Sequence, residues 1–173
     1  LLGYDLLGAR EGDSSVFRPQ PGDAVEVELH WRASESLGEE GVETSYTVFV
    51  QVIDAAGRLV AQHDGLPAGG AAPTTTWAPG EVVRDRHALA LPPDLPAGRY
   101  ALIAGLYDAS TLRRLRTATA DHVVLGYLAV GGPAQGLSGS GAAALDRPGE
   151  GAYHPIKPRS EVLHAAGQLS AAR

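Results

Sequence analysis

The chain has 173 residues, of which 44% are hydrophobic and 20% are charged, and this composition is typical of a soluble globular domain with room for a tail. Its formal net charge of −6 argues against a nucleic-acid partner, because the phosphates of nucleic acid require a basic surface. The absence of Cys excludes disulfides, thiol nucleophiles and thiolate zinc sites. No apolar run approaches the roughly 20 residues of a membrane span.

The N-terminal residues and the residue usage bear on the origin of the chain. It begins with Leu1 instead of Met and shows no signal peptide, so we interpret it as a mature fragment or an excised domain. Met is absent and Lys157 is the only Lys. Loss of thermolabile residues is a mark of thermophile proteins, although a GC-rich genome produces a similar excess of Arg over Lys.

The first half of the chain is dominated by alternation of apolar and polar residues. Residues 24–31 alternate strictly, which predicts a strand with one wet face. Residues 44–54 are apolar on both faces and predict a central strand. Asp54-Ala55-Ala56-Gly57 predicts a hairpin turn, with residues 58–63 as the returning strand. Two short strands, at 3–7 and 14–18, are expected before these.

The second half continues the pattern after a long connection. Residues 64–80 hold many Gly, Pro and Thr and predict an irregular connection, followed by a strand at 81–91. Alternation resumes at 99–107, and a turn is expected at 108–111. Residues 112–117 are too charged for a central position and predict an edge strand. A last strand, apolar on both faces, is expected at 122–130.

These seven to nine short strands, with no helical periodicity before residue 131, predict an all-β fold over residues 1–130. An immunoglobulin-like antiparallel β-sandwich fits the spacing of strands and turns best, with a closed barrel as the alternative.

Residues 131–173 form a Gly/Ala/Pro-rich tail that cannot build its own core. Only residues 160–169 predict a short helix, with Ser160 as its N-cap. We interpret the tail as a docking arm on a protein partner or a neighbouring subunit, either as an added strand or as an extended segment in a groove. Its candidate contact residues are Tyr153, Ile156 and Leu163.

The stretch PTTTWAPGEVVRDRHALALPPDLPAGRYALIAGLYD at 73–108 carries a resemblance. It is similar to an accessory β-sandwich domain that follows the membrane-embedded part of bacterial glycosyltransferases of the protein-mannosyltransferase and aminoarabinose-transferase type, and to related surface proteins. The likeness extends to LLGYDL at 1–6, PGDAVEVELHWRA at 21–33 and YTVFVQVIDAAGRLVAQHD at 46–64. It implies an extracytoplasmic, non-catalytic module, because the transferase's catalytic carboxylate lies in its membrane portion. The positions that carry it include Glu81, Asp85, Tyr100 and Asp108, for which we expect structural roles.

Two aromatic residues are the candidates for a carbohydrate site. Trp77 and Tyr107, if exposed in a row, would stack on sugar rings; we prefer for Trp77 a structural role, in which its ring caps the open end of the sandwich. Trp31 ends an alternating strand and is expected in the core.

Glu81 and Asp85 are the candidate carboxylate pair of a glycoside hydrolase. Four residues apart on a strand, they would lie about 13 Å apart, which is wider than retaining or inverting pairs require. We expect Asp85 to bind backbone N–H groups of the preceding loop instead.

The six His show no metal-binding spacing, and we expect no metal and no cofactor. Asp54, Asp64 and Asp108 follow or precede turns, where turn formation is commoner than a calcium site.

The sequence therefore predicts a non-catalytic structural or interaction module at the cell surface. The alternative is a carbohydrate-binding accessory module, and a free-standing hydrolase comes third, because no acid, base and nucleophile converge in the sequence.

Overall fold

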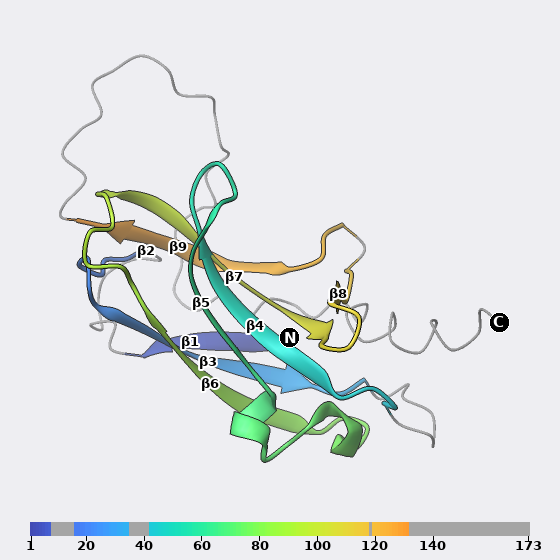
Figure 1. The fold of residues 1–173 in the computed structure, drawn as a ribbon. Coiled ribbons are helices and arrows are strands. Elements are labelled where there is room, and N and C mark those ends of the chain that lie inside the picture. Colours follow the sequence, from blue (N-terminus) through green and yellow to red (C-terminus); the bar gives the residue numbers. More distant parts are fainter. Residues whose placement is uncertain (8–15, 35–41, 118, 132–173) are drawn as a thin grey trace.

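The computed structural model describes residues 1–7, 16–34, 42–117 and 119–131, which form two β-sheets packed on one core (Figure 1). Sheet A has the strand order β1–β3–β6, and sheet B has the order β2–β9–β7–β4–β5, with β8 paired to β7. Neighbouring strands are antiparallel except β2 and β9, which run parallel. The elements are β1 (Gly3–Leu7), β2 (Val16–Phe17), β3 (Ala24–Arg32), β4 (Tyr46–Ile53), β5 (Leu59–Gly65), the 3₁₀ turns η1 (Pro67–Gly70) and η2 (Thr74–Thr76), β6 (Val82–Ala90), β7 (Gly98–Asp108), β8 (Arg113–Arg114) and β9 (Val123–Val130).

The strand order is that of an immunoglobulin-like sandwich, as the sequence predicts. Sheet A corresponds to strands A, B and E of that fold, and β9–β7–β4–β5 corresponds to G, F, C and C′. Tyr100, near the start of β7, donates its hydroxyl hydrogen to the carbonyl of Pro96 at 2.8 Å. This bond is the tyrosine corner of such sandwiches, and it ties the β6–β7 connection to strand β7. The two separate sheets exclude the closed barrel.

Alternation of side chains builds the core between the sheets. On β3, the inward residues Val25, Val27, Leu29 and Trp31 are at most 2% exposed. On β6, the inward positions are Val83, Asp85, His87 and Leu89, and all four are buried. Two titratable side chains therefore stand on the inner face of a strand whose neighbouring inward positions are apolar.

The predicted strands are confirmed, with differences at their edges. The turn after β4 is the expected one: the N–H of Gly57 donates to the carbonyl of Asp54 at 2.9 Å, and Gly57 adopts the φ of +76° that favours glycine. The edge strand expected at 112–117 shortens to Arg113–Arg114, paired to the end of β7. The connection at 64–80 contains η1 and η2.

The apolar residues on both faces of β4 also have a structural reason. Val48, Val50 and Val52 face the core, while Phe49 lies on the outer face of sheet B and is nevertheless only 1% exposed. The guanidinium of Arg114 covers its ring at 4.1 Å in a cation–π contact, so the β7–β9 connection shields this ring from solvent. Within the described residues, no helix is long and apolar enough to cross a membrane. The helix predicted at 160–169 lies outside these residues.

Candidate functional site

Trp77 lies in the connection between β5 and β6, with its ring inside the sandwich. Its side chain is 3% exposed, and its indole N–H donates to the carbonyl of Ala72 at 2.8 Å. Nearby, the buried hydroxyl of Thr74 donates to the carbonyl of Thr44 and accepts the N–H of Tyr46. The connection is thus bonded to the start of β4, and no exposed indole face is left to stack on a sugar.

Glu81 and Asp85 have different hydrogen-bond partners and do not form a carboxylate pair. Glu81 is exposed and accepts the N–H of Ala78 at 2.8 Å, which closes the turn before β6. Asp85 is 1% exposed. One of its oxygens, Oδ1, accepts the N–H of Ala68 in η1 at 2.9 Å, which is the bond to the preceding connection that the sequence predicts.

The second oxygen of Asp85 belongs to a buried polar chain that we call the polar seam: Trp31, Asp85, His87 and His63. Asp85 Oδ2 lies 3.2 Å from the indole Nε1 of Trp31, which donates to it, and 2.8 Å from His87 Nε2. His87 Nδ1 in turn lies 2.8 Å from Nδ1 of His63 on β5. The seam therefore joins the adjacent edges of the two sheets, β6 of sheet A and β5 of sheet B.

The tautomers of His87 and His63 decide which nitrogen donates in each contact of the polar seam. In the tautomer that directs Nε2–H of His87 at the carboxylate, Nδ1 of His87 accepts a hydrogen bond. His63 then donates through its own Nδ1, so its Nε2 keeps a lone pair. A carboxylate that orients a histidine is also found in hydrolases, but here His87 is 3% exposed and its second nitrogen is taken by another imidazole.

Tyr107 lies on the outer face of sheet B, whereas the Trp77 ring is buried in the core, so the two do not form an exposed aromatic row. Its ring is half-buried and tilted against Phe49, with centroids 6.4 Å apart. Burial, and after it the negative charge of Asp64, raises the pKa of the Tyr107 phenol. A carbohydrate-binding surface of the expected kind requires an exposed row that contains both Trp77 and Tyr107. The described residues do not form such a row.

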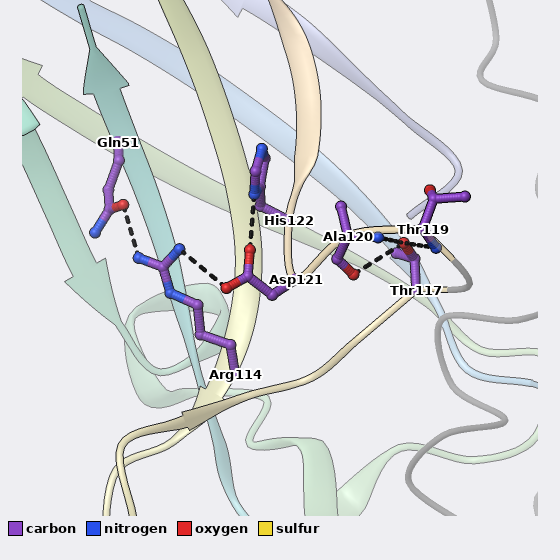
Figure 2. Close-up of polar contacts among 7 residues, drawn as sticks. All are labelled: Gln51, Arg114, Thr117, Thr119, Ala120, Asp121 and His122. Carbon is purple, nitrogen blue, oxygen red and sulfur yellow. Dashed lines mark hydrogen bonds and ion pairs between the residues drawn. The ribbon is translucent and has the colours of Figure 1, made fainter. Parts of the chain in front are cut away.

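Polar contacts tie the β7–β9 connection to this same outer face, as Figure 2 shows. Arg114 donates through NH2 to Gln51 Oε1 at 2.9 Å, and its NH1 lies 3.8 Å from Asp121 Oδ2. The other oxygen of Asp121 pairs with His122 Nδ1 at 2.8 Å, and this bond is the main reason why the pKa of Asp121 is lowered. Thr117 closes the adjacent turn on Ala120.

Asp54, Asp64 and Asp108, the three aspartates considered as a calcium site, lie at different levels along strand β4 and do not form one cluster. Asp54 follows the last residue of β4, whereas Asp108 is paired with Tyr46, the first residue of that strand. Asp64 is paired with Phe49 in between. Asp54 and Asp108 each accept hydrogen bonds from their own turn, which lower the pKa of each carboxyl.

A cluster that the sequence did not predict lies on the outer face of sheet A. His30 Nε2 is 3.1 Å from Asp5 Oδ2 and 3.4 Å from Glu28 Oε1, and the three ligand-type atoms lie within 4.8 Å of one another. The other oxygen of Glu28, Oε2, accepts a hydrogen bond from Arg86 Nε at 2.6 Å. Among the described residues, this is the group of His and carboxylate side chains with the spacing that a metal ion requires.

The remaining sequence-predicted residues are placed as follows. Trp31 is in the core, Tyr100 forms the tyrosine corner and Asp108 forms a turn. The candidate contact residues of the tail, Tyr153, Ile156 and Leu163, lie outside the described residues.

No family model and no curated protein matches this chain. Among solved structures, it is similar to the CARDB domain of the PF1109 protein from Pyrococcus furiosus, which was solved in complex with di-metal ions. The two chains are 16% identical; the match covers 75% of this chain and 91% of that chain, and its TM-score is 0.40. It is also similar to AvmM, which catalyses macrocyclization in alchivemycin A biosynthesis, with 14% identity, 79% and 92% covered, and a TM-score of 0.33. Likenesses this low assign neither family nor ligand, and the fold class rests on the strand order and the tyrosine corner.

Proposed function

We propose that this β-sandwich is a non-catalytic structural or interaction module that acts outside the cytoplasm as part of a cell-surface protein. The observation that carries the proposal is the use of Asp85. This carboxylate is one of the two that the sequence offered as possible catalytic groups, and it takes part in three internal hydrogen bonds, with Trp31, Ala68 and His87.

These bonds stabilise a rigid module. A buried carboxylate with all its bonds made stiffens the segments that it joins, whereas a catalytic acid or base must reach a substrate proton. Asp85 holds η1 and strand β3 against β6, and Trp77 is bonded to its own connection. The long connection at 64–80 is therefore anchored at several points, as a scaffold requires.

The partner of the module is proposed to be a protein, contacted through residues 131–173. Gly131, the last described residue, directly follows β9; its φ is +85°, and a Cβ there would lie 2.7 Å from Cβ of Ala97. Beyond this point the apolar side chains of Tyr153, Ile156 and Leu163 stand in a sequence rich in Gly, Ala and Pro. Burial of these side chains on a partner would contribute about 25 cal/mol per Å².

Site-specific photo-crosslinking tests the interaction. A benzophenone amino acid replaces Ile156 in the full chain, displayed on a cell surface, and a second variant carries it at the exposed Val124 on β9 as the matched control. We expect a discrete protein adduct from position 156 and none from position 124. Adducts only to lipid or to random proteins at both positions would contradict the docking arm.

An activity panel tests the non-catalytic part. Aryl glycosides and aryl esters should not be turned over by the purified chain. Turnover that Asp85→Asn abolishes while the circular dichroism spectrum stays native would overturn the proposal in favour of a hydrolase.

The alternative, a carbohydrate-binding accessory module, is favoured by one observation. The half-buried phenol of Tyr107 shares the outer face of sheet B with the polar side chains of Gln51 and Arg114. Glycan-array binding that Tyr107→Ala removes, with Tyr127→Ala as the control on the same face, would support this alternative.

A further inference from the structure

The pairing of β1 with β3 places three potential metal ligands together on the outer face of sheet A. Asp5 is directly opposite Glu28, and Gly3 is directly opposite His30. Glu28 and His30 are two residues apart on β3, so both side chains point to the same face. Gly3 has no side chain, and the space beside it is open. The imidazole of His30 can therefore lean along the strand toward Asp5 and Glu28.

The distances match the edges of a tetrahedral coordination sphere. Ligand atoms that surround Zn²⁺ at about 2.0–2.1 Å are roughly 3.3 Å apart from one another. His30 Nε2 lies 3.1 Å from Asp5 Oδ2 and 3.4 Å from Glu28 Oε1. Two of the three edges thus have the required length without any movement of the backbone.

An unpaired nitrogen is the second, independent observation. His30 Nε2 is the one buried side-chain nitrogen or oxygen in the described part of the chain that has no hydrogen-bond partner. It is close to two carboxylate oxygens, yet neither contact has hydrogen-bond geometry. A buried polar atom without a hydrogen-bond partner is costly, and two carboxylate oxygens beside it favour a positive charge between them, carried either by a proton on this nitrogen or by a bound cation. A metal ion between the three atoms would bind the nitrogen and neutralise both carboxylates.

A supporting interaction orients one of the carboxylates. Arg86, on β6, donates through Nε to Glu28 Oε2 at 2.6 Å, and this leaves Oε1 on the side of His30. Hydrogen bonds of this kind orient carboxylate ligands in metal sites. The side chain of Glu28 is only 10% exposed, so its position is well determined by its neighbours.

We propose that Asp5 Oδ2, Glu28 Oε1 and His30 Nε2 form a binding site for one divalent transition-metal ion, of which Zn²⁺ is the best fit, with a fourth position open to water. An imidazole nitrogen with two carboxylate oxygens suits Zn²⁺, whereas Ca²⁺ prefers six to eight oxygen ligands. Because Asp5 comes from the edge strand β1 and the other ligands come from β3, the ion would clamp that edge strand to the sheet.

Titration of the full chain with Zn²⁺ alone, after treatment with a chelator, tests the site. We expect one ion per chain by isothermal titration calorimetry and a melting temperature that rises with Zn²⁺ concentration, because the ion binds the folded state. Co²⁺ in place of Zn²⁺ should show the visible absorption of a tetrahedral complex. In ¹⁵N-histidine spectra, Nε2 of His30 should be the nitrogen whose resonance moves.

Three variants make the test specific. His30→Gln and Asp5→Asn should abolish the site, and Arg86→Lys, which disturbs only the orientation of Glu28, should weaken the affinity by about tenfold. His122→Gln is the matched control, since His122 is also paired with an aspartate at 2.8 Å but does not belong to a group of three ligand-type side chains within the described residues. It should bind Zn²⁺ as the unchanged chain does.

Two results would overturn the proposal. The first is a dissociation constant for Zn²⁺ above about 1 mM in the unchanged chain, because such weak binding does not indicate a specific transition-metal site. The second is binding that persists in His30→Gln, which would locate the ion at other histidines. If Asp5→Asn fails to fold, the ¹⁵N-histidine spectrum of the unchanged chain still decides whether His30 is a ligand.

Discussion

At the scale of single residues, buried polar side chains carry much of the specificity of this sandwich. Asp85 and Trp77 are both inside, and each bonds a different part of the 64–80 connection. A buried group that loses its partners costs more than an exposed one, because water cannot replace the lost bonds. Substitutions at these two positions should therefore act on stability.

Trp77→Ala should lower the free energy of unfolding by about 3–5 kcal/mol, because it empties the space of a large core side chain and leaves the carbonyl of Ala72 unpaired. Chemical denaturation followed by circular dichroism measures the change. Leu112→Ala is the control, since that side chain is 76% exposed. Equal stability of the two variants would show that Trp77 is not structural.

Asp85→Ala should destabilise the fold by about 3–5 kcal/mol, since three donors lose their shared acceptor inside the protein. Asp94→Ala, at an exposed position in the β6–β7 connection, serves as the comparison and should change little. A stable Asp85→Ala variant would mean that the polar seam contributes nothing to the fold.

At the scale of elements, the outer layer on sheet B depends on a glycine. Gly105 on β7 is opposite Phe49 on β4, and a Cβ at Gly105 would lie 2.5 Å from the Phe49 ring. The ring cannot give way easily, because Arg114 covers it and the backbone carbonyl of Asp121 is 3.3 Å from the same point. The close approach of these strands to the β7–β9 connection thus requires a residue without a side chain.

Gly105→Ala should therefore destabilise the domain by about 1–3 kcal/mol, the usual cost of overpacking. Phe49→Leu removes the ring atoms that the new methyl group would meet. The penalty of Gly105→Ala should therefore be smaller in the double variant. A double-mutant cycle by denaturation measures the coupling. Purely additive effects would show that the ring does not meet the added methyl group.

The turn after β7 should contribute a pH-dependent part of the stability. Hydrogen bonds from the Ser110 hydroxyl, then from the Thr111 hydroxyl, lower the pKa of Asp108 below its ordinary value of 3.8. A lowered folded-state pKa stabilises the fold above the unfolded value, and this contribution is lost as the pH falls through the folded value.

Asp108→Asn should consequently flatten the fall of the melting temperature with acid. Thermal scans between about pH 5 and about pH 2 would show curves that converge at the acid end. Curves for the two proteins that stay parallel over this range would contradict a role of the Asp108 charge.

At the scale of the whole molecule, the residues that the structure describes form a sandwich whose last strand is β9. Among the described residues, the core is a single cluster that draws on both sheets, with members from Leu1 to Val130. A chain that ends at Gly131 should therefore melt within about 2 °C of the full chain, as measured by calorimetry. A large fall in melting temperature would show that residues 132–173 contribute to the fold itself and do not serve only a partner.

The sequence by itself determined the local structure. Alternation placed the strands, apolar residues on both faces marked β4 as an inner strand, and Asp54 with Gly57 marked a hairpin turn. These patterns are local, because the side chains of a strand alternate with a period of two whatever its partners are. They also identified Asp85 as a residue that binds the preceding connection.

Only the tertiary structure decided which distant side chains meet. The motif of Glu28 and His30, two apart on one wet face, is visible in the sequence, but Asp5 joins it only through the register of β1 on β3. In the same way, His63 reaches His87 because β5 and β6 are the adjacent edges of opposite sheets. Such contacts depend on strand order and register, which arise from packing of the whole core and not from the pattern of any one segment.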